Sequence, residues 1–324
     1  MRAKFTRRPP RTGEASMGRS PHWPGQTMSV PAPMLATATN HHPAPYSPRA
    51  STGRTQHTMM GSSHAATGAA AWVALAGTVP GTLGLVGPFD NAGLAAGMVV
   101  AAGAALLPDI DHHNGTIAHS LPPISNLAAK LSENLSGGHR KGTHSLFGLG
   151  LAGAASVGAA QLQHVVESVG TLHVGAGVGA ILLCAFALRA LNLTEGRVMT
   201  WIASVVLAAC VVLFASNDWV WFPSAVVIGY AAHLVGDLVT TGGIPVTWPF
   251  VMKPPKWWRR APLLSDVWRA NGNLAIPILG DSGSKREELL LSLLTMWLLW
   301  VAVSQWLGFD VVVWLATVSG GLTR

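Results

Sequence analysis

Long apolar segments alternate with short polar ones along most of the chain. A helix that crosses a lipid bilayer needs roughly 20 consecutive apolar residues. The apolar stretch over residues 311–318 is too short to be predicted as a further transmembrane helix, so the presence of an eighth membrane segment is left open. Together the segments predict an all-α, polytopic α-helical membrane protein with about seven transmembrane helices. The seven segments cover residues 66–87, 92–108, 145–166, 172–191, 199–216, 219–240 and 289–308.

The composition agrees with this class. Charged residues make up only 11% of the chain and hydrophobic residues 49%, whereas charged residues are roughly 25% of soluble globular proteins. Both cysteines, Cys184 and Cys210, lie inside predicted helices. Their position argues against a disulfide framework and against a thiolate metal site.

The net charge of +7 belongs to the first 58 residues. They carry eight Arg or Lys residues against Glu14 alone, while the other residues balance 13 cations with 13 anions. This Pro-rich stretch has no apolar periodicity, so we expect a disordered basic tail over 1–58 and a membrane-embedded domain over 59–324. Translation from Met59 or Met60 is an equally good alternative. The stretch lacks the apolar core of a signal peptide, and nucleic-acid binding, which would rest on it alone, is not expected.

The remaining cations predict an orientation in the membrane. The loops after the first, third and fifth apolar segments contain no Lys or Arg, whereas those after the second, fourth and sixth contain twelve when Arg189, at the end of the fourth segment, is counted. Cytoplasmic loops carry such an excess of basic residues. We therefore expect a multi-pass protein of the inner or plasma membrane with a cytoplasmic N-terminus. The sequence leaves its oligomeric state open.

Four groups of ionisable residues lie at the ends of predicted membrane helices. Such residues are costly near a bilayer and usually functional. The alternation of the helices brings all four groups to the cytoplasmic face, without any assumption about packing. They are His64; Asp109 and Asp111; His139 and His144; and His233 and Asp237.

Each group by itself has two interpretations. His233 and Asp237 are four residues apart and project from one helix face, so they can share a metal ion or form a helix pair. Asp109 and Asp111 point the same way in an extended segment, or they belong to a solvated loop. Jointly, imidazoles and carboxylates from four helix ends form a donor set for Zn²⁺, or alternatively Mn²⁺.

The third group adds positive charge. His139 and His144 flank Arg140 and Lys141, which suit an anionic substrate but equally serve the predicted orientation. Thr143 precedes a predicted helix and is the candidate N-cap.

Three motifs resemble a known family. They are LPDIDH at 107–112, GHRKGTHS at 138–145 and GYAAHLVGDL at 229–238. In this order and spacing they resemble the YdjM-type inner-membrane proteins, usually described as LexA-regulated, membrane-bound metal-dependent hydrolases. The resemblance covers about residues 60–300 and implies control by LexA in the SOS response.

That family is in turn thought to be distantly related to the zinc-dependent phospholipase C and single-strand nuclease fold. This chain lacks the later histidines of that fold, so one or two metal ions are expected rather than three. The resemblance implies six candidate ligands: His64, Asp109, His139, His144, His233 and Asp237.

These features lead to a hydrolase hypothesis. A divalent metal, Zn²⁺ first and Mn²⁺ as the alternative, would activate water on a phosphoester-like substrate at the cytoplasmic face, with a lipid as one candidate. Asp111 is a candidate bridging ligand or general base, and Arg140 and Lys141 are candidates for stabilising negative charge. The alternatives are a metal or proton transporter, or a non-catalytic stress-response membrane protein. Carriers usually bind at the membrane midplane, which favours the enzyme.

Overall fold

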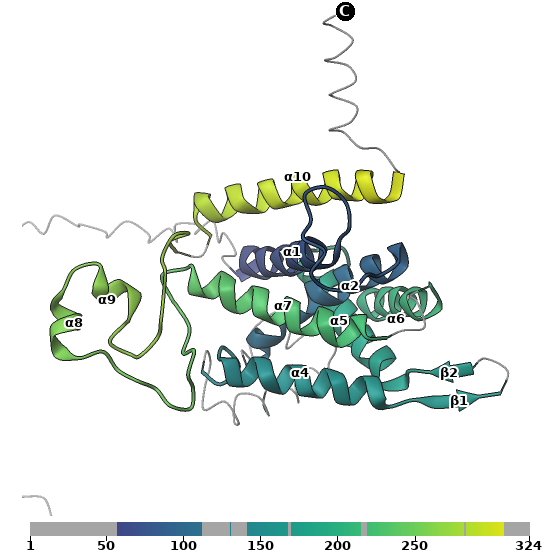
Figure 1. Ribbon diagram of the computed structural model, residues 1–324, viewed down its shortest axis with the longest axis horizontal. Coiled ribbons are helices and arrows are strands. Elements are labelled where there is room, and N and C mark those ends of the chain that lie inside the picture. Colours follow the sequence, from purple (N-terminus) through teal and green to yellow (C-terminus); the bar gives the residue numbers. More distant parts are fainter. Residues whose placement is uncertain are drawn as a thin grey trace, which may run out of the picture. The chain divides into compact units, whose positions relative to one another are not determined.

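A computed structural model describes residues 57–111, 130, 141–167, 170–214, 219–281 and 283–307. These residues are mainly helical, as predicted, apart from one short antiparallel hairpin (Figure 1). The tail over 1–56 and residues 311–318 lie outside the described residues. The helices are α1 (His57–Ala76), α2 (Asn91–Ala104), the 3-10 helix η1 (Leu107–Asp111), α4 (Leu146–Gln161), α5 (Val174–Ala190), α6 (Arg197–Phe214), α7 (Trp221–Leu238), α8 (Lys256–Arg260), α9 (Leu264–Val267) and α10 (Lys285–Leu307).

Side-chain caps begin α2, α4 and α10, the last through the hydroxyl of Ser284, which accepts a hydrogen bond of 3.3 Å from the Glu287 amide. The carboxylate of Asp90 accepts a hydrogen bond of 2.7 Å from the Gly93 amide at the start of α2. The hydroxyl of Ser145 accepts one of 3.2 Å from the Gly148 amide at the start of α4. Such caps satisfy amides that have no partner inside the helix. The predicted N-cap at Thr143 is therefore wrong by two residues.

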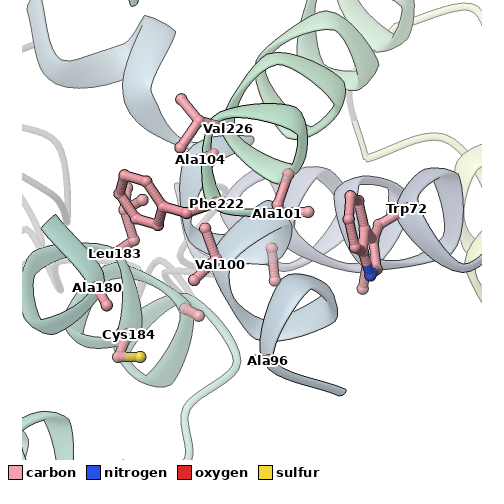
Figure 2. Close-up of a cluster of buried hydrophobic side chains, with 14 of the residues drawn as sticks. Trp72, Ala96, Val100, Ala101, Ala104, Ala180, Leu183, Cys184, Phe222 and Val226 are labelled. Carbon is pink, nitrogen blue, oxygen red and sulfur yellow. The ribbon is translucent and has the colours of Figure 1, made fainter. Parts of the chain in front are cut away.

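Helix α7 packs against four other elements: α1, α2, α4 and η1. A close approach between α7 and α2 depends on Gly229, because a Cβ there would lie 2.2 Å from the Ala101 carbonyl oxygen. Val100, Phe222 and Val226 fill the adjoining core (Figure 2). Small residues at helix contacts let backbones approach closely in this way.

The helix bounds differ from the apolar segments chiefly around α1 and around α4. Helix α1 begins at His57, nine residues before the expected start at residue 66. The first segment was expected to continue to residue 87, but α1 ends at Ala76. Pro80 follows, and Gly81, Gly84 and Gly87 have positive φ, which is incompatible with a continuing helix.

At the second place, α4 ends at Gln161 instead of residue 166. The hairpin of β1 (His164–Val166) and β2 (Gly170–Leu172) then leads to α5. Apolar content alone did not distinguish these β-branched residues from a helix end.

Helix α10 is the helix among the described residues that is both long and apolar enough to cross a membrane, over Lys285–Trp306. Four further apolar helices are shorter, at 10–17 residues. The helical class is thus confirmed, whereas seven membrane crossings stay a prediction.

Candidate metal centre

Five ionisable side chains from four parts of the chain meet beside the middle of the helical core. Helix α1 contributes His64, η1 contributes Asp109, and the turn before α4 contributes His144. Helix α7 contributes both His233 and Asp237, which are one turn apart.

Four of these residues place their donor atoms around a common point. The Nε2 atom of His144 lies 3.2 Å from Nε2 of His233, and 3.4 Å from both Oδ1 of Asp109 and Oδ2 of Asp237. Nε2 of His233 lies 3.6 Å from Oδ2 of Asp237 and 3.9 Å from Oδ1 of Asp109. We call these four residues the four-donor centre.

The spacing suits a single divalent ion. Donors held at roughly 2.0–2.2 Å from Zn²⁺ in a tetrahedron lie about 3.3–3.6 Å from one another. The five separations that involve a histidine nitrogen in the four-donor centre range from 3.2 to 3.9 Å. Two imidazole nitrogens and two carboxylate oxygens are also ligand types that Zn²⁺ and Mn²⁺ accept. The buried His and Asp groups could therefore hold a metal ion.

The outer nitrogens of both imidazoles are hydrogen-bonded, so that Nε2 faces the centre. Nδ1 of His233 donates to the Ala105 carbonyl oxygen at 2.6 Å. Since a carbonyl oxygen only accepts, the proton lies on Nδ1 and the lone pair on Nε2. Nδ1 of His144 lies 3.1 Å from the Thr143 hydroxyl oxygen, and this contact holds the ring with Nε2 towards the centre. Metal-binding histidines are usually oriented by partners of this kind.

His64 approaches the centre from the other side of Asp237. Its Nε2 lies 3.4 Å from Oδ1 of Asp237, while Oδ2 faces His144 and His233. Its ring also stacks on His233, with 3.9 Å between ring centroids. His64, His233 and Asp237 thus form a second group that could hold a metal ion. Asp237 is positioned to bridge two ions, or to accept a hydrogen bond from His64.

The turn that carries His144 is clamped on several sides. The Ser145 hydroxyl donates to the Gly142 carbonyl oxygen at 2.6 Å while it caps α4. The Tyr230 hydroxyl, on α7, donates to the Thr143 carbonyl oxygen. The Leu146 amide donates to the carbonyl oxygen of Val246 at 3.1 Å. These bonds fix the His144 backbone relative to the helix that carries His233.

The centre is buried except at one edge. His144, His233 and Asp237 are almost completely buried, whereas the Asp109 side chain keeps 26% of its surface exposed. Protein surrounds most of Asp109, and this burial would raise its pKa. The facing imidazoles of His233 and His144 outweigh burial and hold the Asp109 pKa well below its usual range.

Burial acts in the opposite sense on His144. It lowers the pKa of this imidazole despite the neighbouring Asp109 carboxylate. An anionic Asp109 and a neutral His144 are the protonation states in which these side chains bind metal ions.

The other candidate residues are placed less fully. Asp111 ends η1, and its side chain lies outside the described part of the chain, as do His139 and Arg140. Lys141 is exposed, three residues before His144. Between the two histidines of this motif, the structure places His144 at the centre. The contribution of Tyr230 was missed, because a tyrosine on an apolar helix gives no signal of a partner 87 residues away.

A family model described as "YdjM inner membrane protein" matches residues 59–190 and 197–308. The matched ranges contain all four residues of the four-donor centre and His64. The match confirms the resemblance that the three sequence motifs predict. Neither the curated proteins nor the solved structures contain a significant match.

Proposed function

We propose that this chain, which belongs to the YdjM inner membrane protein family, is a metal-dependent hydrolase with its active site at the four-donor centre. Membership of an inner membrane protein family associates it with the lipid bilayer. The family assignment concerns the location of the protein, and the proposal adds a chemical activity to it.

One observation carries the proposal: both imidazoles direct Nε2 to a point that two carboxylates also face. Two buried carboxylates side by side repel each other unless cations or protons neutralise them. Asp109 and Asp237 lie within 3.4 Å of the same His144 nitrogen. A divalent cation at this point would neutralise both. It would also use the lone pairs that the bonds to Ala105 and Thr143 direct inwards.

The chemistry follows from the donors and from the exposed edge. A divalent ion held by His144, His233, Asp109 and Asp237 supplies Lewis-acid activation of water and of the substrate oxygen. Zn²⁺ is the first candidate and Mn²⁺ the second. Asp109 is the donor that keeps partial exposure, so water reaches the centre on its side. In the hydrolysis of a phosphoester, water oxygen attacks phosphorus, the bond to the leaving alcohol breaks, and a water proton ends on that alcohol.

Residues near the donors in the sequence are candidates to complete the proposed site. Asp111, two residues after Asp109, is the candidate general base, and Lys141 and Arg140 are the candidates for stabilising negative charge on the substrate. His139 is a candidate ligand or a support for one. The excess of basic residues in every second loop supports a site at the cytoplasmic face and an N-terminus in the cytoplasm.

The test measures metal content and activity together. Full-length protein purified in detergent is expected to contain one or two equivalents of zinc or manganese and to hydrolyse a chromogenic phosphodiester such as bis(para-nitrophenyl) phosphate. Asp109→Asn and His233→Ala should lose metal and activity. Asp266→Asn and His164→Ala, at exposed sites outside the centre, are the matched controls and should lose neither.

Two outcomes would overturn the proposal. Bound metal without hydrolysis of phosphodiester or lipid substrates would leave a binding protein. Metal flux in proteoliposomes that His233→Ala abolishes would indicate a transporter instead.

A further inference from the structure

An elongated cavity extends away from the candidate centre along three helices. It has a volume of about 630 Å³ and is lined by α1, α7 and α10. Helix α1 packs against both α7 and α10 and forms the floor of the cavity. Small residues provide the space: Ala70, Ala71 and Ala74 on α1, and Ala231 and Ala232 on α7. We call it the α1–α7–α10 cavity.

The polarity of the cavity changes along its length. His64 and Asp237, both members of the candidate metal groups, line one end, together with Glu287 on α10. The Glu287 carboxylate accepts a hydrogen bond of 2.7 Å from the Gly283 amide, so it is engaged in capping α10. Leu75, Val227 and Trp297 line the other end. The cavity therefore leads from a hydrophilic, metal-binding end to an apolar end.

The length of the cavity matches one leaflet of a membrane. From His64 to Leu75 on α1, and from Val227 to Asp237 on α7, the lining covers about 15 Å at 1.5 Å rise per residue. The hydrocarbon core of a bilayer is about 30 Å thick, so an acyl chain in one leaflet extends about 15 Å. Val235, which lines the cavity, is 58% exposed.

We propose that the α1–α7–α10 cavity binds the acyl chain of a membrane lipid and so presents the lipid's headgroup ester to the candidate metal centre. This inference rests on the proposed hydrolase function and specifies its substrate as a lipid phosphoester. The apolar lining stabilises the acyl chain by burial. The polar headgroup of the lipid then lies at the level of His64. A lipid phosphoester has an apolar end and an anionic end, which match the apolar end and the metal-binding end of the cavity.

A second apolar cavity provides an internal control. It has a volume of about 380 Å³ and lies between α4, α5 and α7, with Ala152 and Ala155 in its lining. Thr143 lines it too, but none of its lining residues belongs to the four-donor centre. Filling it should therefore leave the path to His64 and Asp237 open.

The experiment compares one bulky substitution in each cavity in full-length protein reconstituted with phospholipid. Ala231→Phe should reduce turnover of a long-chain phospholipid by about tenfold or more, because it excludes part of the chain from the cavity. Turnover of the water-soluble bis(para-nitrophenyl) phosphate and the metal content should stay near wild type. Ala155→Phe should leave both turnovers unchanged. Ala231→Leu is the milder variant if the phenylalanine impairs folding, which the metal content reveals.

A binding measurement separates failure of this inference from failure of the hydrolase proposal. A phospholipid with a photoreactive group at the chain end should crosslink near Leu75 and Trp297, and one with the group near the headgroup should crosslink near Thr67. Ala231→Phe should abolish both crosslinks. If the crosslinks form without any hydrolysis, the cavity binds lipid and the enzymatic proposal fails. If hydrolysis persists in Ala231→Phe, or if only Ala155→Phe impairs it, the inference about this cavity is wrong.

Discussion

Replacing Thr143 by valine tests whether the orientation of His144 is part of the candidate metal centre. The substitution keeps the side-chain size and removes the hydroxyl that lies 3.1 Å from Nδ1 of His144. Loss of a hydrogen-bonding partner behind a metal-binding histidine typically lowers metal affinity by about 10–100-fold, or about 1.4–2.7 kcal/mol. Thr143 is only half-buried, so water can replace part of the lost bond. We expect an effect near the lower limit, about tenfold.

The assay is a competition between the purified apoprotein and a fluorescent zinc chelator of known affinity. Thr143→Ser keeps a hydroxyl at this position and should bind zinc like the wild type. Asp109→Asn, which removes a donor atom instead of its support, should weaken binding by more than about 100-fold. Wild-type affinity in Thr143→Val, together with a large loss in Asp109→Asn, would refute the argument that Nδ1 orients His144 for a metal ion.

Three further predictions concern packing, capping and orientation. Gly229→Ala should destabilise the fold by about 1–3 kcal/mol, because its Cβ would lie 2.2 Å from a backbone carbonyl oxygen of α2. Thermal unfolding should show a lower Tm for this variant. Gly150→Ala is the control and should keep the wild-type Tm, because open space surrounds Gly150. Ser145→Ala removes the N-cap of α4 and should lower the free energy of chemical unfolding by about 1 kcal/mol. It should also weaken zinc binding, because the same hydroxyl holds the turn that carries His144. Unchanged zinc affinity would show that this turn does not depend on the Ser145 hydroxyl. In a cysteine-free background, His164→Cys in the hairpin should react with a membrane-impermeant maleimide added outside intact cells, and Lys253→Cys should not; the reverse pattern would invert the predicted topology.

The meeting of the ionisable residues could be predicted because it depends on topology alone. Apolar segments that alternate in direction return every second connection to the same face, whatever the packing between them. Asp109 and His144 lie at such connections, while His64 in α1 and His233 in α7 lie within about two helical turns of one, and the structure brings the four together. The number of membrane crossings could be predicted less well from the sequence. Hydropathy marks apolar segments but does not reveal that Pro80 and the glycines after it end α1 early.

The choice between neighbouring residues depended on backbone details that the sequence pattern does not contain. His139 and His144 were both candidates; the position of His144 depends on the turn over 141–145, and His139 lies outside the described residues. In this turn the Ser145 hydroxyl bonds to both Gly142 and Gly148 and leaves His144 directed inwards. Both Thr143 and Ser145 are good N-cap residues. In the structure Ser145 begins the helix, and the Leu146 amide beside it donates to Val246, a hundred residues further along the chain.

Helix α7 shows why one short motif carries so much of the site. Gly229, His233 and Asp237 recur every four residues and therefore lie along one face of the helix. Gly229 lets this face touch the backbone of α2, which places the Ala105 carbonyl oxygen, just beyond α2, within 2.6 Å of His233. The close packing thus orients the imidazole as well as burying it.

The residues beside this face serve the neighbouring elements. Tyr230 holds the turn that carries His144. At Gly236, a Cβ would lie 3.2 Å from the His64 ring, so glycine leaves that ring room to stack on His233. The two glycines are consequently as specific to the centre as the donor residues, because each sets the distance from α7 to an element that supplies or orients another donor. An alanine at Gly236 should therefore displace His64 and leave the four-donor centre intact, which would show whether activity needs the second candidate metal group.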